Sequence, residues 1–272
     1  MTGPDVEIQI RPAQTVADYF ACQRAQRLAW GIEDDGYLVP IATMVGAQHH
    51  GGLVLGAFLP DSQAVGLSFA FLGRTDGQLC LYSQLTGVVP GYQDRGLGGR
   101  MKARQREFAR EQGLPLIVWA FDPLQAGNAQ FNLNKLGATS RRYLVDMYGP
   151  RTDALNRATP TDRLIAVWRT EPTPPRVVEP DRFAVLPKVV GGRVNADWDR
   201  EPEYLGLPGY AEALLLEIPD DVNRLRAERP DLAWRWGQVV REGFLACFRS
   251  GYVAVGFVRE EGRGAYLLER SP

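Results

Sequence analysis

Cysteine and lysine are both scarce in this chain of 272 residues. The three cysteines, Cys22, Cys80 and Cys247, are far apart and odd in number. They are therefore expected to form neither a disulfide framework nor a metal cluster, and a reduced, cytoplasmic setting fits this pattern. Only three of the 31 basic residues are lysines, and the net charge is −1. Without an overall positive charge, the chain is not expected to bind nucleic acid.

Long apolar segments are also missing. No apolar run approaches the length of about 20 residues that a membrane-spanning helix needs, so a membrane is not an expected partner. The first ten residues lack a basic segment followed by an apolar core, which argues against a signal peptide. The hydrophobic fraction of 45% and the charged fraction of 23% are ordinary for a globular protein. The length allows one large domain or two smaller ones.

The most informative segment of the sequence is VVPGYQDRGLGGR, residues 88–100. An apolar, strand-like run leads into a glycine-rich turn, and a helix is expected to begin near Leu97. Such a helix start directs free backbone N–H groups and the positive end of the helix dipole at one point. Glycine lets an anion approach the backbone because it has no Cβ. The segment therefore predicts a binding site for a phosphate compound.

Two common phosphate-binding motifs do not fit this segment. A P-loop needs Lys and then Ser or Thr directly after its last glycine, whereas Gly99 is followed by Arg100 and Met101. A dinucleotide fingerprint needs G-x-G-x-x-G at the first strand-to-helix turn. Here the glycines are Gly96, Gly98 and Gly99, with a different spacing, in the middle of the chain. A glycine-rich turn that only caps a helix remains an alternative.

A third pattern, Q/R-x-x-G-x-G/A, fits residues 93–98 (QDRGLG) as they stand. This segment resembles the pyrophosphate loop of the GNAT superfamily, the acyl-CoA-dependent N-acyltransferases. Residues 128–138 (NAQFNLNKLGA) form a second landmark. They resemble the N-x-x-x-x-x-x-x-L-G-F/A segment of GNAT proteins, in the predicted-acetyltransferase branch that has an added C-terminal region. The resemblance covers roughly Val6 to Arg169.

The pattern of apolar residues and turn signals predicts the element order β-α-α-β-β-β-α-β-α-β-β over this region. This is the order of a GNAT domain. The resemblance implies an α+β (mixed α/β) GNAT-like fold, with a mixed central sheet of about seven strands and flanking helices. The expected strands are Val6–Arg11, Leu53–Leu59, Ala64–Leu72, Gln78–Val89, Leu116–Phe121, Ala138–Met147 and Arg163–Arg169, and the expected helices are Val16–Trp30, Tyr37–Gln48, Leu97–Gln112 and Asn128–Leu136.

The composition predicts a second part of the chain after a proline-rich linker. A GNAT acyl-CoA-binding domain is expected at residues 1–170, the linker at 171–181, and a C-terminal extension that docks on the first domain at 182–272. The extension could instead be a degenerate second GNAT half, although it lacks a phosphate loop. Its expected elements are a strand at Ala213–Ile218, a helix at Leu232–Phe248 and a hairpin of Tyr252–Val258 with Ala265–Glu269.

The resemblance implies a reaction and a set of binding residues. The co-substrate would be an acyl-CoA, most simply acetyl-CoA, and a small amine or an amino-terminal group would attack the thioester directly. Two valines would line the thioester and pantetheine, residues 93–100 would wrap the pyrophosphate, and two residues of the second landmark would flank the pantetheine arm. The implied residues are Val88, Val89, Gln93, Asp94, Arg95, Gly96, Leu97, Gly98, Gly99, Arg100, Asn128 and Phe131.

The catalytic groups depart from the family's usual pattern. Many GNAT enzymes use a Glu on the fourth strand as base and a Tyr near the end of the last helix as acid. Residues 79–89 contain no acid, and Leu133 occupies the Tyr position. Asp122 and Ser83 are the candidate substitutes. The missing groups leave open an acyl-CoA-binding or regulatory module without turnover, or a structural protein. The chain is expected to be a monomer or a homodimer.

Overall fold

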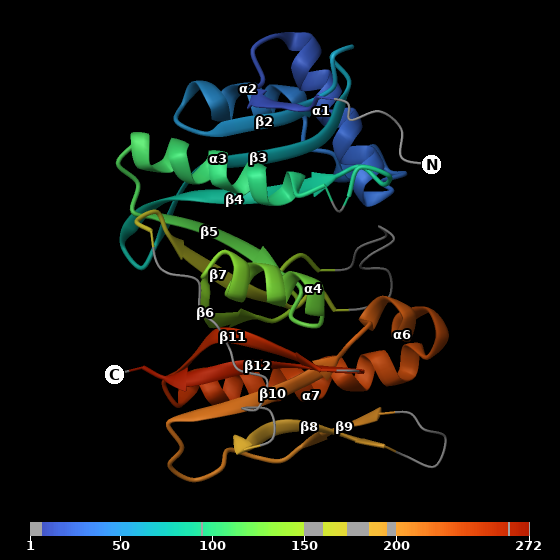
Figure 1. The fold of residues 1–272 in the computed structure, drawn as a ribbon, viewed down its shortest axis with the longest axis vertical. Coiled ribbons are helices and arrows are strands. Elements are labelled where there is room, and N and C mark those ends of the chain that lie inside the picture. Colours follow the sequence, from blue (N-terminus) through green and yellow to red (C-terminus); the bar gives the residue numbers. More distant parts are fainter. Residues whose placement is uncertain are drawn as a thin grey trace. The chain divides into compact units, whose positions relative to one another are not determined.

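The computed structural model describes residues 7–93, 95–149, 160–172, 185–194, 200–260 and 262–271 (Figure 1). The chain forms two compact units, which divide between Trp119 and Ala120. Arg169–Glu171 also belong to the first unit. These units are defined by contacts within the chain, and the expected domain boundary near residue 170 stays a prediction. Most of the expected linker lies outside the described residues.

The first unit contains strands in the order β1-β2-β3-β4-β5. Neighbouring strands are antiparallel from β1 to β4, whereas β4 and β5 are parallel. The strands are β1 (Gln9–Pro12), β2 (Leu53–Phe58), β3 (Ala64–Thr75), β4 (Gln78–Val88) and β5 (Leu116–Phe121), of which the last two residues of β5 belong to the second unit. The helices are α1 (Val16–Trp30), the short 3-10 turn η1 (Asp35–Tyr37), α2 (Ile41–His49) and α3 (Leu97–Glu111).

Helix α1 shows how the sequence fixes an element of this unit. Thr15 and Asp18 form a capping box, and Gly31 ends the helix in the left-handed conformation with φ of 60°. The carboxylate of Asp18 also accepts two hydrogen bonds from the guanidinium of Arg11 in a bidentate pair, each 2.9 Å long. This pairing lowers the pKa of Asp18 well below its usual range. Strand β1 and helix α1 are thereby joined at the start of the unit.

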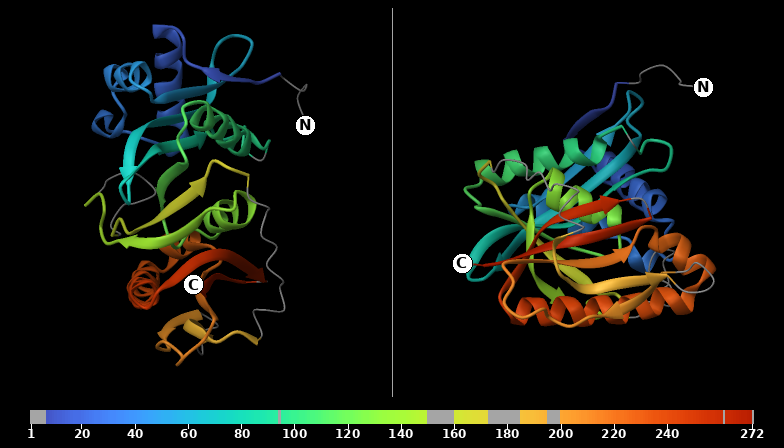
Figure 2. Two further views of the ribbon diagram at one scale, coloured as in Figure 1. Left: turned by 90° about the vertical axis from the view of Figure 1, so that its left-hand side faces the viewer. Right: turned by 60° about the horizontal axis from the view of Figure 1, so that its bottom comes forward.

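The second unit contains strands in the order β7-β6-β11-β12-β10-β8-β9. Long helix α7 packs across β6, β8, β9, β10 and β11 (Figure 2). The strands are β6 (Thr139–Leu144), β7 (Arg163–Arg169), β8 (Lys188–Val194), β9 (Arg200–Tyr204), β10 (Ala213–Pro219), β11 (Tyr252–Glu260) and β12 (Arg263–Arg270). The helices are α4 (Ala126–Ala129), the π-helical turn η2 (Gln130–Lys135), α6 (Val222–Glu228) and α7 (Pro230–Arg249).

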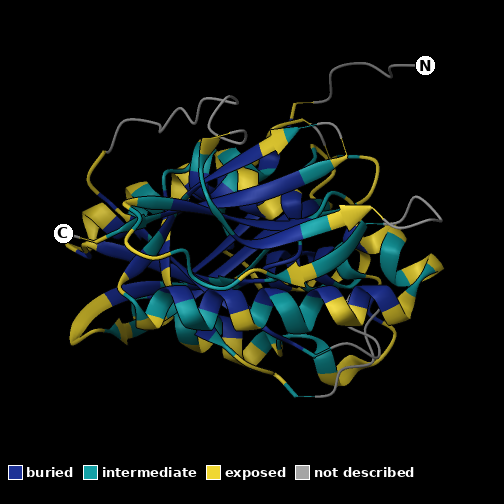
Figure 3. Cartoon of the chain, turned by 90° about the horizontal axis from the view of Figure 1, so that it is seen from below, coloured by how far each residue is buried: buried dark blue, intermediate teal, exposed yellow. Residues whose placement is uncertain are grey.

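The buried side of α7 forms much of the second unit's core (Figure 3). Phe244 is completely buried. Its ring stacks on Tyr143 at a centroid distance of 5.7 Å and meets Tyr266 edge-on at 4.9 Å. These are favourable aromatic geometries, and they connect the helix to strands β6 and β12.

The expected sheet of about seven strands is an underestimate, because the described residues form twelve strands. The unpredicted strands include β8 and β9. Strand β8 contains Gly191 and Gly192, and β9 reads REPEY, with charged residues and Pro202. Neither has the apolar alternation of a strand. Because β9 lies at the end of the strand order, proline and charge are tolerated there.

Within the described residues, no helix combines the length and the apolar character needed to cross a membrane. The same residues hold no group of three His, Cys, Asp or Glu side chains placed to bind a metal. All three cysteines are free and buried. Burial raises the pKa of Cys22 and of Cys247 to about 12, so both are weak nucleophiles.

We predict that Phe244→Ala lowers the free energy of unfolding by about 3–5 kcal/mol, because it removes a buried ring and leaves a cavity. Chemical denaturation monitored by circular dichroism would measure this loss. The partly buried neighbour Phe248 provides the control, since Phe248→Ala should cost clearly less. Equal losses in the two variants would contradict the central position assigned to Phe244.

Candidate functional site

The start of helix α3 leaves backbone donors available. The helix follows Gly96, which has φ of 70° and serves as its N-cap. None of the described side chains caps this end, and the first turn contains no acidic residue. The first intrahelical bond runs from the N–H of Arg100 to the carbonyl of Gly96 at 3.0 Å. The N–H groups of Leu97, Gly98 and Gly99 precede that bond, so they can bind an anion.

Open space lies beside this helix start. A Cβ placed on Gly98 would have no atom within 4 Å, and the same holds for Gly96 and Gly91. The glycine at position 98 is therefore not required by packing of the described protein atoms. Its conformation does not require glycine either, because its φ is not positive. The absence of a Cβ at Gly98 would instead let a ligand come close to the backbone.

The side chains around the turn divide into buried and exposed ones. Leu97 is 1% exposed and packs in a core cluster with Met101, so only its backbone faces outward. Gln93 and Arg95 are exposed, and the guanidinium of Arg95 lies 5.4 Å from the ring centre of Tyr92. Both exposed side chains are therefore accessible beside the helix start.

Two of the predicted binding residues, Arg100 and Gln93, hold the turn in place through hydrogen bonds to backbone carbonyls. Arg100 is exposed but donates to the carbonyl of Ile8 at 3.1 Å. Gln93 donates to the carbonyl of Val88 at 3.3 Å, which closes the turn on the strand. Asp94, also among the predicted binding residues, lies outside the described residues.

Strands β4 and β5 pair only over a short distance. The described pairs are Leu81 with Ile117 and Tyr82 with Val118. On its other side, β4 pairs with β3 through a register shift that leaves Gln84 as a bulge residue. The part of β4 that leads to the glycine-rich turn thus has backbone groups on its β5 side without a described strand partner. Such groups can bind an extended ligand.

The two valines before the turn are partly buried strand residues. Val88 packs beside the cluster that contains Leu97, and Val89 packs beside a second cluster that contains Leu67. The N–H of Val89 donates to the carbonyl of Val65 at 2.9 Å. It is therefore already engaged, and a ligand would have to use other backbone groups of this segment.

Ser83 lies in a buried polar cluster between β3, β4 and α3. Its hydroxyl accepts from the Nζ of Lys102 at 2.9 Å and donates to the Oε1 of Gln105 at 3.1 Å. Gln105 donates to Ser68 at 2.7 Å, and the Ser68 and Thr86 hydroxyls are 2.7 Å apart. Ser83, Lys102 and Gln105 are all buried. The candidate catalytic serine is thus held in a chain of hydrogen bonds beneath α3.

Lys102 is an unusual member of this cluster because its ammonium group is buried. Besides Ser83, it contacts the ring of Trp119, with Nζ 4.0 Å from the ring centre. The cluster's described side chains carry no carboxylate that could balance its charge. Burial lowers the pKa of Lys102 to about 7. Lys102 was not among the residues predicted from the sequence. Its spacing of three and seven residues from Gln105 and Ala109 places it on the same buried face of α3, and this spacing was the available signal.

The other predicted site residues belong to the second unit. Asp122 follows β5 and accepts from the backbone N–H of Leu124 and from Arg226, at 2.9 Å each. Asn128 is exposed and Phe131 is partly buried. The structure therefore brings Ser83, Val88, Val89 and the helix start together in the first unit. The positions of Asp122, Asn128 and Phe131 are described within the second unit alone.

We predict that the free energy of unfolding rises with pH between about 7 and 10.5 because of Lys102. In this window the unfolded chain holds a proton on Lys102 that the folded chain has released, so alkali favours the folded state. One such group contributes at most about 1.4 kcal/mol per pH unit. Lys102→Met should abolish that contribution, measured by urea denaturation across the window. Lys135→Met, at an exposed lysine, is the control, and an identical pH slope in Lys102→Met and wild type would refute the assignment.

The chain matches no protein-family model and no curated protein. Among solved structures it is similar to yncA of Salmonella typhimurium, solved with its cofactor acetyl-CoA, at 19% identity and a TM-score of 0.48, over 64% of this chain and 99% of that one. It is also similar to the ribosomal-protein-S18-alanine N-acetyltransferase of Escherichia coli, at 14% identity and a TM-score of 0.47, over 64% of this chain and 100% of that one.

A third similar structure is an acetyltransferase of the GNAT family from Staphylococcus aureus Mu50, at 13% identity and a TM-score of 0.43, over 61% of this chain and 100% of that one.

Proposed function

We propose that this protein is an acyl-CoA-dependent N-acyltransferase, with acetyl-CoA as co-substrate and a small amine or an amino-terminal group as acceptor. The observation that carries the proposal is the start of helix α3. There, three backbone N–H groups precede the first intrahelical bond without a described side-chain cap, and a Cβ on Gly98 would meet no atom within 4 Å. A diphosphate is a ligand that such a site fits.

Each part of the predicted loop has a role in this proposal. The N–H groups of Leu97, Gly98 and Gly99 bind the pyrophosphate, and Arg95 and Arg100 add positive charge beside it. Gln93 and Asp94 complete the loop, and Gly96 provides the sharp turn. The main chain at Val88 and Val89 lies along the pantetheine and the thioester. The assignment of Asn128 and Phe131 to the pantetheine arm stays a prediction from the resemblance alone.

The reaction requires little from side chains. The amine nitrogen attacks the thioester carbonyl, and a tetrahedral oxyanion forms. The C–S bond then breaks as the amide is completed, the amine loses a proton, and the leaving thiolate is protonated. The protein contributes proximity of the two reactants and oriented backbone donors. The part of β4 beyond Tyr82, which has no described pairing with β5, supplies such donors.

We predict that acetyl-CoA binds the wild-type protein and that Gly98→Glu abolishes binding without unfolding the protein. The new side chain has room, but its carboxylate occupies the place of the anion and repels it. Isothermal titration calorimetry measures the affinity, and circular dichroism checks the fold.

Gly46 offers a matched control. It also lies in a helix of the first unit, and a Cβ there would likewise meet no atom within 4 Å. Gly46→Glu adds the same charge outside the loop and should retain affinity. Wild-type protein that gives neither heat nor a thermal shift with millimolar acetyl-CoA would disprove the cofactor assignment. Retained binding in Gly98→Glu would disprove the location.

A second candidate function is an acyl-CoA-binding or regulatory module without turnover. It is favoured by the contacts of the two candidate catalytic groups. Ser83 is buried and bonded to Lys102 and Gln105, and Asp122 is paired with Arg226 and with a backbone N–H. Both groups therefore already have structural partners. They remain the candidate proton acceptors of the proposed enzyme.

We predict that Ser83→Ala or Asp122→Asn lowers kcat by about 10²–10⁴-fold if that group is the proton acceptor. A group with only a structural role would instead lower the melting temperature and leave kcat nearly unchanged. Thiol release with a panel of amines, measured together with thermal unfolding, distinguishes the two. If both variants keep kcat, neither group is the base. If wild-type protein binds acetyl-CoA but releases no thiol with any amine, the module is the better description.

A further inference from the structure

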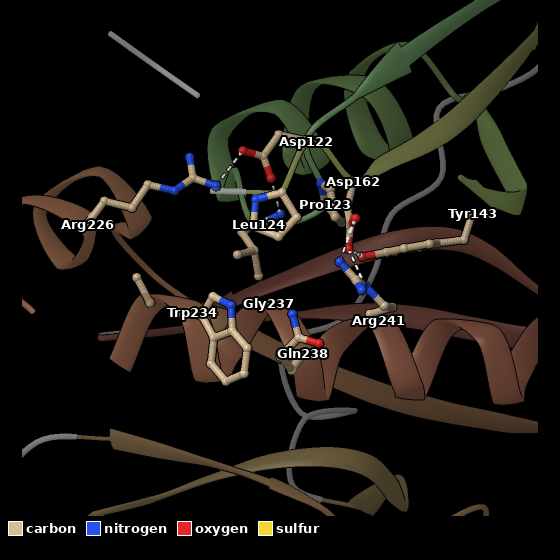
Figure 4. A pocket seen from close by; sticks show the side chains of 12 residues that line it. Asp122, Pro123, Leu124, Tyr143, Asp162, Arg226, Trp234, Gly237, Gln238 and Arg241 are labelled. Carbon is tan, nitrogen blue, oxygen red and sulfur yellow. Dashed lines mark hydrogen bonds and ion pairs between the residues drawn. The ribbon is translucent and has the colours of Figure 1, made fainter. Parts of the chain in front are cut away.

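The second unit contains a pocket whose lining shares only Asp122 with the residues of the proposed function (Figure 4). The pocket is partly open to solvent. Its lining comes from the segment after β5, from β6, from the segment just before β7 and from α6 and α7. We propose that this pocket binds a small zwitterion with an amino and a carboxylate group, namely a free α-amino acid. The proposal does not rest on acyl transfer, because it uses the charge of Asp122 and not its proposed role as a proton acceptor, and none of the lining residues belongs to the glycine-rich turn.

One side of the pocket is built around the carboxylate of Asp162. It accepts from the hydroxyl of Tyr143 at 2.7 Å and from the N–H of Asp146 at 3.0 Å. It also accepts from the Nε and Nη2 of Arg241, at 2.8 and 2.9 Å. Four donors fill the capacity of a carboxylate. Asp162 is therefore not available to a ligand, and its role is to hold Arg241 in one orientation.

Arg241 still has donors to offer. Asp162 uses its Nε hydrogen and one Nη2 hydrogen, and a contact with the hydroxyl of Tyr143 uses at most one more. A guanidinium has five N–H bonds, so at least two remain for a ligand. The side chain is 21% exposed, which leaves these donors reachable. A guanidinium that is fixed in place suits a carboxylate, which can accept two bonds at once.

The other side of the pocket carries Asp122. Its Oδ1 accepts from the N–H of Leu124, and its Oδ2 accepts from Arg226. These bonds use about two of the four acceptor positions of the carboxylate. Figure 4 shows Asp122 and Arg241 on opposite sides of the pocket. An ammonium group near Asp122 and a carboxylate near Arg241 would therefore each find an opposite charge.

Two further residues of α7, Trp234 and Gln238, also line the pocket. Trp234 is 53% exposed although it lines the pocket, and the face of an indole ring attracts a cation. The amide of Gln238 also lines the pocket and makes no hydrogen bond with the described residues. It can donate to a carboxylate or accept from an ammonium group. Free polar groups of this kind are expected where a ligand binds.

The balance of charge selects a zwitterion over a simple ion. The lining contains two aspartates, Asp122 and Asp162, and two arginines, Arg226 and Arg241, so its formal charges cancel. A lone anion would be attracted by Arg241 but repelled by the carboxylates, and a lone cation would meet the reverse. A molecule with both charges matches both sides at once. Repulsion between like charges therefore disfavours both a lone anion and a lone cation in this pocket.

We predict that at least one free amino acid binds the full chain, tested by calorimetry with the common amino acids at millimolar concentration and no acetyl-CoA. Its amide, which lacks the carboxylate, and its N-acetyl derivative, which lacks the ammonium group, should each bind at least about tenfold more weakly. Gln238→Ala and Trp234→Ala should weaken binding by about fivefold or more with an unchanged fold.

The neighbouring Val239 provides a control on the same helix. It is also partly buried, but it does not line the pocket. Val239→Ala shortens a side chain at the next position and should bind like wild type. The proposal is overturned if no free amino acid binds, if the amide or the N-acetyl derivative binds equally well, or if Gln238→Ala and Val239→Ala bind alike. Because acetyl-CoA binding is measured separately through Gly98→Glu, failure of one proposal leaves the other standing.

Discussion

The first N–H groups of a helix have no partner within the helix, and this constraint decides what the start of α3 can be. Leu97, Gly98 and Gly99 provide these groups, and across the described part of the chain no side chain caps them. The helix is nevertheless fixed, because Leu97 and Met101 are buried in the core. A set of unsatisfied donors on a rigid helix is suited to a diphosphate, since no reorganisation is needed when the ligand arrives.

The polar cluster beneath α3 adds to this rigidity. Lys102 and Gln105 on the helix contact Ser83 on β4, next to the point where the described pairing of β4 with β5 ends. Apolar side chains could pack at this place in several ways, whereas a chain of hydrogen bonds has one arrangement that satisfies every member. The burial of an ammonium group opposes folding. The hydrogen bonds of the cluster also fix the position of the helix start relative to strand β4.

The sequence predicted the elements that depend on local signals. Helix α1 was placed at Val16–Trp30, where Thr15, Asp18 and Gly31 give both ends a cap. The unbroken apolar run Leu116–Phe121 was predicted as a strand, and it is β5. Strands β8 and β9 were missed because their glycines, charges and proline are tolerated only in the context of their neighbours. The partner of Asp122 could not be predicted either, since Arg226 is 104 residues away and the pairing depends on the fold.

The two candidate sites differ in what forms them, and this explains why only one was visible in the sequence. The site at α3 consists mainly of backbone groups, so it requires particular glycines at a fixed spacing, and such a spacing is a readable motif. The pocket of the second unit consists of side chains, from Asp122 to Arg241, that separate segments of the chain contribute. No spacing links those segments, so a structure is needed to bring them together. A binding site made of backbone groups can therefore be predicted from a sequence motif. A binding site made of side chains from separate segments has no such motif.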